Sequence, residues 1–181
     1  MELLWVFIRL IMKLFLLILT YLLTVICHGQ KFRFNNDGTA EYIVRSADSI
    51  SASLLHSRTL KWIQNNVNNP EEAIKAKSKN QMVKVDGILQ SAFTLELDSI
   101  KYDYDVTYSL EIHFKKGKYR VLYTHHAIIA AGQRPVFKMS DILNEKPDPE
   151  DKKWVNHRNQ YETRVQTLLN SLHRTIVRRG K

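Results

Sequence analysis

The sequence predicts an α+β domain, with an antiparallel sheet of about five to six strands and helices packed on one face. Two observations predict this class. Short segments in which apolar and polar residues alternate follow one another through the middle of the chain, as in strands with one buried face. One segment with helical spacing precedes most of them and another follows them, which is typical of an α+β arrangement.

The first expected elements are a turn and a strand. Phe32–Phe34 leads into Asn35–Gly38, and the Asp-Gly pair in that segment is a strong turn signal. A strand is expected next, because Ala40, Tyr42 and Val44 alternate with Glu41, Ile43 and Arg45.

The first helix is expected over Ile50–Val67, with Asp48 or Ser49 as its N-cap residue. The asparagines that follow, and then Pro70, are expected to end it. Helical spacing places four side chains on its buried side: Leu55, Thr59, Trp62 and Ile63.

The alternation then returns and predicts the rest of the sheet. Its segments are Ile74–Lys79, Met82–Leu89, Phe93–Leu97, Val106–Phe114 and Tyr119–Tyr123. The last two are expected to form a hairpin, since the turn Lys115–Lys118 contains a glycine. Residues 30–130 are therefore expected to form the domain, and residues 131–149 an irregular linker. Residues 150–179 have the spacing of an amphipathic helix that packs on the same domain.

In that order, four sequence segments resemble a known family: FNNDGTAEYIV, RTLKWI, VKVDGIL and TYSLEIHFKKGKYRVLYT. Its members are exported proteins of Gram-negative bacteria, a domain of unknown function with a TATA-binding-protein-like (TBP-like) fold. The resemblance covers Phe32–Ile129, and its markers are Asp37-Gly38, Trp62, Gly87 and Gly117–Arg120. It implies the element order β-α-β-β-β-β-α and no established activity, and a fold name does not supply a function.

Residues 1–29 have the character of a signal peptide. The uncharged apolar run Leu14–Cys27 is shorter than the roughly 20 residues that span a bilayer. Cleavage is expected near Gly29–Gln30, and Met12 is an alternative start. The protein is therefore expected in the periplasm or cell envelope. An uncleaved N-terminal anchor is the alternative that the sequence leaves open.

The chain is basic, with 27 Lys and Arg against 18 Asp and Glu, a net charge of +9. Removing Glu2, Arg9 and Lys13 with the leader changes this to +8, so the basicity belongs to the domain. Cys27 is the single cysteine, so a cleaved chain has no disulfide, zinc-thiolate site or cysteine nucleophile.

No catalytic motif is present, which favours a protein that is not an enzyme. Glu111, His113 and His126 form a weak polar cluster, because His113 could face His126 across the hairpin. Two histidines without a clear third ligand are not a convincing metal site. We therefore expect no metal and no cofactor.

Lysines are the strongest surface signal. The candidate patch for an anionic partner comprises Lys75, Lys77, Lys79, Lys84, Lys115, Lys116, Lys118 and Arg120. For Lys75–Lys79 we favour another interpretation, in which lysines protect an exposed sheet edge from pairing with another chain. Nucleic acid is disfavoured, because Tyr108, Tyr119 and Tyr123 lie on the apolar face and the protein is expected to be exported.

These observations favour an exported binding or assembly domain without enzymatic activity. Its partner would be an anionic component of the envelope or another envelope protein. The alternative is a small-ligand carrier or an enzyme, with a pocket between the sheet and the helices.

Overall fold

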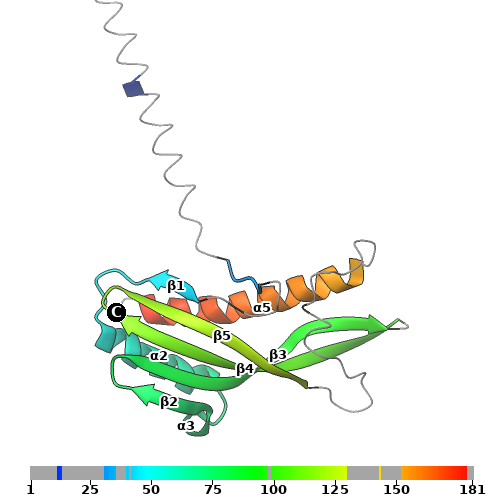
Figure 1. The fold of residues 1–181 in the computed structure, drawn as a ribbon, viewed down its shortest axis with the longest axis horizontal. Coiled ribbons are helices and arrows are strands. Elements are labelled where there is room, and N and C mark those ends of the chain that lie inside the picture. Colours follow the sequence, from blue (N-terminus) through cyan, green and yellow to red (C-terminus); the bar gives the residue numbers. More distant parts are fainter. Residues whose placement is uncertain are drawn as a thin grey trace, which may run out of the picture. The chain divides into compact units, whose positions relative to one another are not determined.

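A five-stranded antiparallel sheet organises the part of the protein that the computed structural model describes, which is residues 12–13, 31–35, 40, 42–97, 99–129, 143 and 152–178. The strands are β1 (Ile43–Ser46), β2 (Ile74–Ser78), β3 (Met82–Leu97), β4 (Ile100–Lys115) and β5 (Lys118–Ile129). Their spatial order is β1-β5-β4-β3-β2 (Figure 1). The predicted α+β class is confirmed.

The chain divides into two units, Met1–Gln30 and Lys31–Lys181. In the first unit the structure describes only Met12 and Lys13, both helical, so the predicted leader lies outside the described residues. Among the helices that the structure does describe, none is both long and apolar enough to cross a membrane. Of the predicted linker 131–149, only Leu143 is described, and its side chain is buried.

The β4–β5 hairpin forms the centre of the sheet. Lys115 pairs with Lys118 around a two-residue turn in which Gly117 has a φ of 75°. That left-handed conformation favours glycine, because it has no Cβ to clash with the backbone. Alternate residues of both strands are buried, as the sequence predicts: Val106, Tyr108, Leu110, Ile112, Phe114, Tyr119, Val121 and Tyr123.

The structure differs from the sequence prediction at two strands. Met82–Leu89 and Phe93–Leu97 are one strand, β3, with an irregularity in pairing between Leu89 and Phe93. Ser91 there has a φ of 46°, and its N–H donates to the Asp105 carboxylate at 2.8 Å. The extra residues bend the strand without ending it, because pairing with β4 resumes beyond them.

The structure also decides which side of β1 faces the core. Ile43 is buried, whereas Tyr42 and Val44 are 39% and 53% exposed. Both sets of residues in this segment alternate, so the pattern alone does not say which set is buried.

Helix α2 (Ala52–Asn66) buries the four side chains predicted for it, Leu55, Thr59, Trp62 and Ile63. Its N-cap is Ser51, not Asp48 or Ser49, and the Ser51 hydroxyl accepts from the Leu54 N–H at 3.2 Å. The short α3 (Pro70–Ala73) follows. Helix α5 (Lys152–Val177) packs against β3 and α2, and its buried residues join those of α2 and of the sheet in one core.

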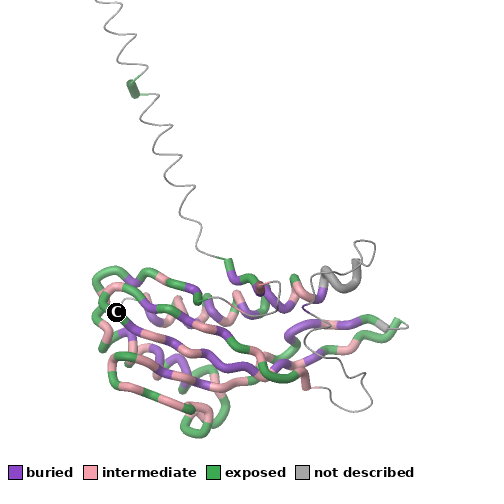
Figure 2. The backbone as a smooth tube through the Cα atoms, in the orientation of Figure 1, coloured by how far each residue is buried: buried purple, intermediate pink, exposed green. Residues whose placement is uncertain are grey.

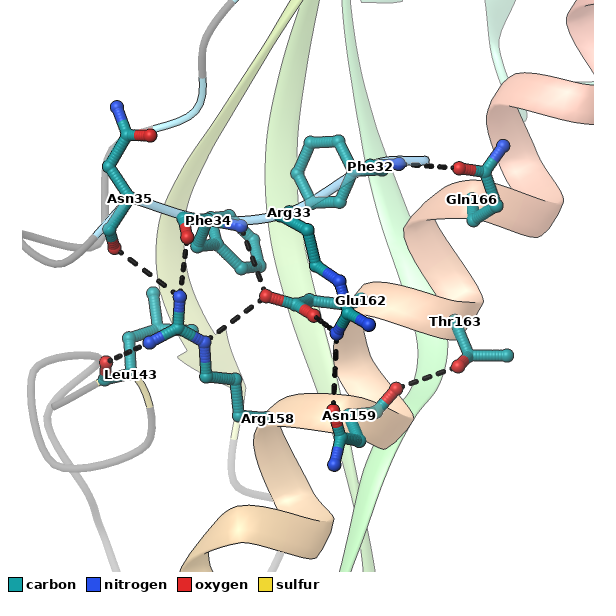
Figure 3. Close-up of polar contacts among 10 residues, drawn as sticks. All are labelled: Phe32, Arg33, Phe34, Asn35, Leu143, Arg158, Asn159, Glu162, Thr163 and Gln166. Atoms are coloured by element: carbon teal, nitrogen blue, oxygen red, sulfur yellow. Dashed lines mark hydrogen bonds and ion pairs between the residues drawn. The ribbon is translucent and has the colours of Figure 1, made fainter. Parts of the chain in front are cut away.

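The segment 31–35 is attached to α5 by side chains (Figure 3). Phe34 donates its N–H to Glu162 at 3.0 Å, and its carbonyl accepts from Arg158. The Phe32 N–H donates to the Gln166 amide oxygen at 2.6 Å, and Arg33 pairs with Glu162. The segment is thus held by side chains of α5, and two of its residues, Phe32 and Phe34, are buried in the core.

The opposite face of the sheet is not covered by a helix within the described ranges. Along the strands, buried residues alternate with half-buried and exposed ones (Figure 2). This second set, which we call the open face, includes Lys84, Glu111, Arg120, Thr124 and His126. Any function that needs an accessible sheet surface must use these residues.

Candidate functional site

Four basic residues meet on the open face at the turn end of the β4–β5 hairpin. Lys115 lies directly opposite Lys118, and His113 directly opposite Arg120. Side chains directly opposite in an antiparallel pair point to the same face, with Cβ atoms about 4.5–5.5 Å apart. This geometry brings part of the predicted basic patch together.

These side chains border a hollow of about 400 Å³, which we call the basic hollow. Its lining residues are Val44, Gln81, His113, Phe114, Lys115, Lys118, Tyr119 and Arg120. These residues, all from the described part of the chain, include three permanent cations and no carboxylate. The hollow is therefore suited to an anionic group, to which lysine and arginine donate charge-assisted hydrogen bonds.

Apolar side chains border the basic hollow at β1. The Arg120 Cζ atom lies 4.5 Å from the centroid of the Tyr42 ring, within the range of a cation–π contact. Val44 lies directly opposite Arg120 across β1 and β5. Exposed Tyr42 and Val44 thus place aromatic and aliphatic surface beside the cations.

The weak polar cluster predicted from the sequence is divided in the structure. His113 Nε2 lies 2.5 Å from Glu111 Oε1, so these two residues do meet. His126 does not face His113, because the hairpin register pairs His113 with Arg120 and brings His126 beside Ser109. No group of three or more potential metal-ligating His, Cys, Asp or Glu side chains occurs among the residues described.

His126 belongs to a hydrogen-bonded chain across three strands. Ser109 Oγ lies 2.5 Å from Asp86 Oδ1 and 2.7 Å from His126 Nε2. A carboxylate only accepts, so Ser109 donates its single hydroxyl hydrogen to Asp86 and accepts from His126. This order is unlike that of an acyl-transfer triad, in which serine donates to histidine and the carboxylate contacts the other ring nitrogen.

The remaining predicted lysines do not share one face. Lys77 is paired with Val83, whose side chain is buried in the core, so Lys77 points to the helix-covered side. Lys84 follows Val83 along β3 and therefore points to the open face. Lys75, at an irregularity of β2, donates to the Glu72 carbonyl at 2.9 Å.

Lys79 lies in the turn after β2, and Lys116 lies in the turn after β4. The patch drawn from the sequence is therefore spread over two turns and both faces of the sheet. Strand β2 is at the edge of the sheet, which is the position that the edge-protection interpretation requires.

Comparisons with known proteins identify the fold. No family model and no curated protein matches the sequence. Among solved structures, a DUF4468 family protein from Bacteroides ovatus is similar, with a TM-score of 0.54 and 11% identity over 80% of this chain and 90% of that one. A TBP-like protein from Parabacteroides distasonis has a TM-score of 0.53 and 13% identity over 75% of this chain and 90% of that one.

The chain has a TBP-like fold. The resemblance to a TBP-like domain of unknown function is thereby confirmed at the level of fold. The expected order β-α-β-β-β-β-α holds for this TBP-like fold, with α3 added between α2 and β2.

A cavity of about 600 Å³ also lies in the TBP-like domain. It is beside the part of β3 that follows Val85, beyond the residues that pair with β2. Of the predicted polar cluster it contains His126, but neither Glu111 nor His113. Asp86 lines it too, and sequence reasoning missed this residue and Ser109. One signal was available, since Asp86 is the one carboxylate in the strand segment VKVDGIL.

Proposed function

We propose that this protein is an exported binding domain without enzymatic activity, which attaches through its open face to an anionic lipid surface of the cell envelope. One observation carries the proposal: Lys115, Lys118 and Arg120 surround one hollow that has no carboxylate in its lining. The apolar run Leu14–Cys27 supports export, because it has the length of a signal-peptide core.

The arrangement of charge favours a bound anion. Lys115 and Lys118 are directly opposite in the hairpin, and like charges at such positions destabilise a sheet. Lys116 lies between them in the turn. Glu111, the carboxylate on the neighbouring part of the face, is already in contact with His113. A phosphate-like group in the basic hollow would relieve this repulsion.

The apolar border of the hollow favours a lipid surface over a soluble polyanion. Tyr42 and Val44 are exposed beside Arg120, and aromatic and aliphatic side chains lie favourably at the boundary between headgroups and acyl chains. Each Lys or Arg close to an anionic leaflet contributes about 1 kcal/mol. Lys115, Lys118 and Arg120 together would contribute about 3 kcal/mol, or about 100-fold in affinity.

The contacts on the open face support a role other than catalysis. Ser109 is 4% exposed and donates to Asp86, so its oxygen is not presented as a nucleophile. His126 donates to Ser109 and therefore does not act as its base.

Vesicle sedimentation tests the proposal with a matched pair of variants of the full-length chain. The first variant is Lys115→Gln/Lys118→Gln/Arg120→Gln, and the control is Lys75→Gln/Lys77→Gln/Lys79→Gln, which loses the same charge from the edge strand and its turn. Both keep the same N-terminal segment, so its contribution to vesicle binding cancels. Vesicles of phosphatidylcholine are compared with vesicles that also contain phosphatidylglycerol.

We expect the first variant to lose about 100-fold of the affinity that phosphatidylglycerol adds, and the control to keep most of it. Equal losses in the two variants would contradict the proposal, because the effect would then follow net charge alone. Binding of dextran sulfate through the basic hollow without any preference for phosphatidylglycerol vesicles would assign the surface to a soluble polyanion instead.

Export has its own test, which is N-terminal sequencing of the protein from its native host. A start near Gln30 would support cleavage of the leader. A start at Met1 or Met12 would contradict it.

A further inference from the structure

The cavity beside β3 is a second concave site, separate from the basic hollow. It forms because β2 pairs only with Met82–Val85, so no strand of the described ranges lies beside the continuing edge of β3. The connection from α2 to β2 supplies the facing wall. The cavity lining includes Asn68, Asn69 and Glu72 from this connection, and Asp86, Ile88 and Gln90 from β3. A volume of about 600 Å³ lies within the range of small-molecule sites.

The lining is rich in side chains that both donate and accept hydrogen bonds. Asn68, Asn69 and Gln90 contribute carboxamide groups and Tyr108 contributes a hydroxyl. The Asn66 amide already donates to the Trp62 carbonyl at 2.9 Å. The Thr107 hydroxyl already bonds both backbone polar groups of Ala127. Asn69 is the N-cap residue of α3, yet its side chain makes no capping bond there. The backbone carbonyl of Asn69 accepts from the Glu72 and Ala73 N–H groups instead, at 3.1 and 3.0 Å. The Asn69 amide is thus not used by α3.

The wall at Gly87 is shaped by Tyr108. A Cβ atom on Gly87 would lie 2.6 Å from both the Cζ and Oη atoms of Tyr108, so the tip of the ring covers this glycine closely. Tyr108 also stacks on Tyr123, with 5.3 Å between ring centroids. Ile88 is 56% exposed and points to the other face of β3, where it gives the cavity an aliphatic side among its polar groups.

The charges of the cavity nearly cancel. Glu72 and Asp86 contribute two carboxylates and Lys75 one ammonium group, which disfavours an anionic ligand and provides acceptors for hydroxyl groups. The Ser109 contact places the hydrogen of neutral His126 on Nε2, which leaves Nδ1 as an acceptor. An apolar ligand would remove these groups from water without offering them hydrogen-bond partners, which disfavours its binding.

We propose that this cavity binds a neutral polyhydroxylated ligand, a monosaccharide or disaccharide. Hydroxyls of such a ligand both donate and accept, which matches carboxamides and carboxylates. The C–H face of a sugar ring matches the exposed aliphatic side chain of Ile88. The site goes beyond the lipid-binding proposal and shares no lining residue with the basic hollow.

The test is titration of the isotope-labelled full-length chain with a panel of neutral sugars, followed by amide NMR. The panel contains glucose, galactose, mannose, N-acetylglucosamine and their α- and β-linked dimers. We expect at least one sugar to shift the amides of Gly87, Ile88 and Gln90, whereas the amides of Lys115 and Lys118 stay unchanged. No saturable shift with any sugar of the panel would overturn the proposal.

A matched pair of variants locates the binding. Asn68→Ala/Gln90→Ala removes two exposed side chains from the cavity, and Gln64→Ala/Asn65→Ala removes the same residue types from the exposed side of α2. We expect the first variant to weaken binding about 10-fold or more and the second to leave it unchanged. Equal affinities of the two variants would overturn the assignment to this cavity.

A charged sugar tests the ligand class. Glucuronic acid should bind at least several-fold more weakly than glucose, because its carboxylate would approach Asp86 and Glu72. Equal or tighter binding of glucuronic acid would overturn the proposal of a neutral ligand. The variant Lys115→Gln/Lys118→Gln/Arg120→Gln should keep its sugar affinity, so failure of the lipid proposal and failure of this one are distinguishable.

Discussion

Arg158 and Glu162 lie one turn apart on α5 and together bind both backbone polar groups of Phe34. The Arg158 Nε atom is 3.1 Å from Glu162 Oε1, which also accepts from the Phe34 N–H at 3.0 Å. Arg158 donates to the Phe34 carbonyl and, at 3.3 Å, to the carbonyl of Leu143 (Figure 3). This pair therefore joins the N-terminal segment around Phe34 and the segment at Leu143 to one helix.

The first prediction concerns this anchor. Glu162 is almost fully buried, and Glu162→Gln removes the charge that faces two arginines, so the free energy of unfolding should fall by about 3 kcal/mol. Arg33→Gln is the control, because the Arg33 side chain is 58% exposed and such ion pairs contribute about 0–1 kcal/mol. Urea denaturation measures both changes, and an equal loss in the two variants would contradict a structural role for the buried carboxylate.

The second prediction concerns a hydroxyl pair in the core. Tyr123 Oη and Tyr161 Oη lie 2.9 Å apart, and burial raises the pKa of both phenols. Tyr161→Phe leaves the Tyr123 hydroxyl without this partner and should cost about 1–3 kcal/mol. The double variant with Tyr123→Phe should recover most of that loss, since no unsatisfied hydroxyl remains. A double-mutant cycle with additive losses would show that the hydroxyls do not interact.

The third prediction concerns the close approach at Gly87. Gly87→Ala places a Cβ atom against the Tyr108 ring and should destabilise the protein by about 1–3 kcal/mol through overpacking. In a Tyr108→Leu background the same change should cost much less, because the ring tip is absent. Gly117→Ala is the comparison for backbone strain alone: no atom lies within 4 Å of its Cβ position, and φ is 75°. That variant should lose about 1 kcal/mol in either background.

The fourth prediction concerns acid stability. Burial beside Phe34 and Tyr161, with a smaller contribution from the charge of His126, lowers the pKa of His125 below that of an ordinary histidine. The unfolded chain therefore binds a proton at His125 more tightly than the folded chain does. The contribution of neutral, buried His125 to the free energy of unfolding is complete above about pH 6.5 and is lost as the pH falls through the folded-state pKa. Burial also lowers the pKa of His56 and His173, which adds to the loss in the same direction.

Denaturant unfolding from pH 8 to pH 5 measures this effect. His125→Phe should reduce the pH dependence of the unfolding free energy. The comparison at pH 8 is the control. There His125 of the unmodified chain is neutral in both the folded and the unfolded state, so the variant differs from it only in packing. An unchanged slope in the variant would mean that His125 does not contribute.

The sequence predicted correctly those elements whose hydrophobic pattern allows only one interpretation. The buried sides of α2 and of the β4–β5 hairpin follow from spacing, because periods of 3.6 and 2 assign each side chain to one face. The bulge in β3 was missed, since Gln90 and Ser91 resemble the end of a strand as much as a bend within one. The buried side of β1 was ambiguous for the same kind of reason, as both sets of residues there include apolar side chains.

The candidate sites depended on pairing register, which a single sequence does not contain. Lys115 and Lys118 were predictably close, because a two-residue turn joins them. Asp86, Ser109 and His126 meet only because three strands align in one register, and His113 is separated from His126 by the same register. A shift of one residue between β4 and β5 would have exchanged these neighbours.

Local patterns in the sequence thus determined the α+β class, the order of its elements and the buried sides of α2 and of the β4–β5 hairpin, because these depend on the spacing of neighbours along the chain. The tertiary structure alone decided that Lys77 and Lys84 point to opposite faces and that Glu162 holds the segment around Phe34. It also decided where β2 ends and leaves a cavity beside β3. These features depend on contacts between segments far apart in the chain, which form only when the whole core packs.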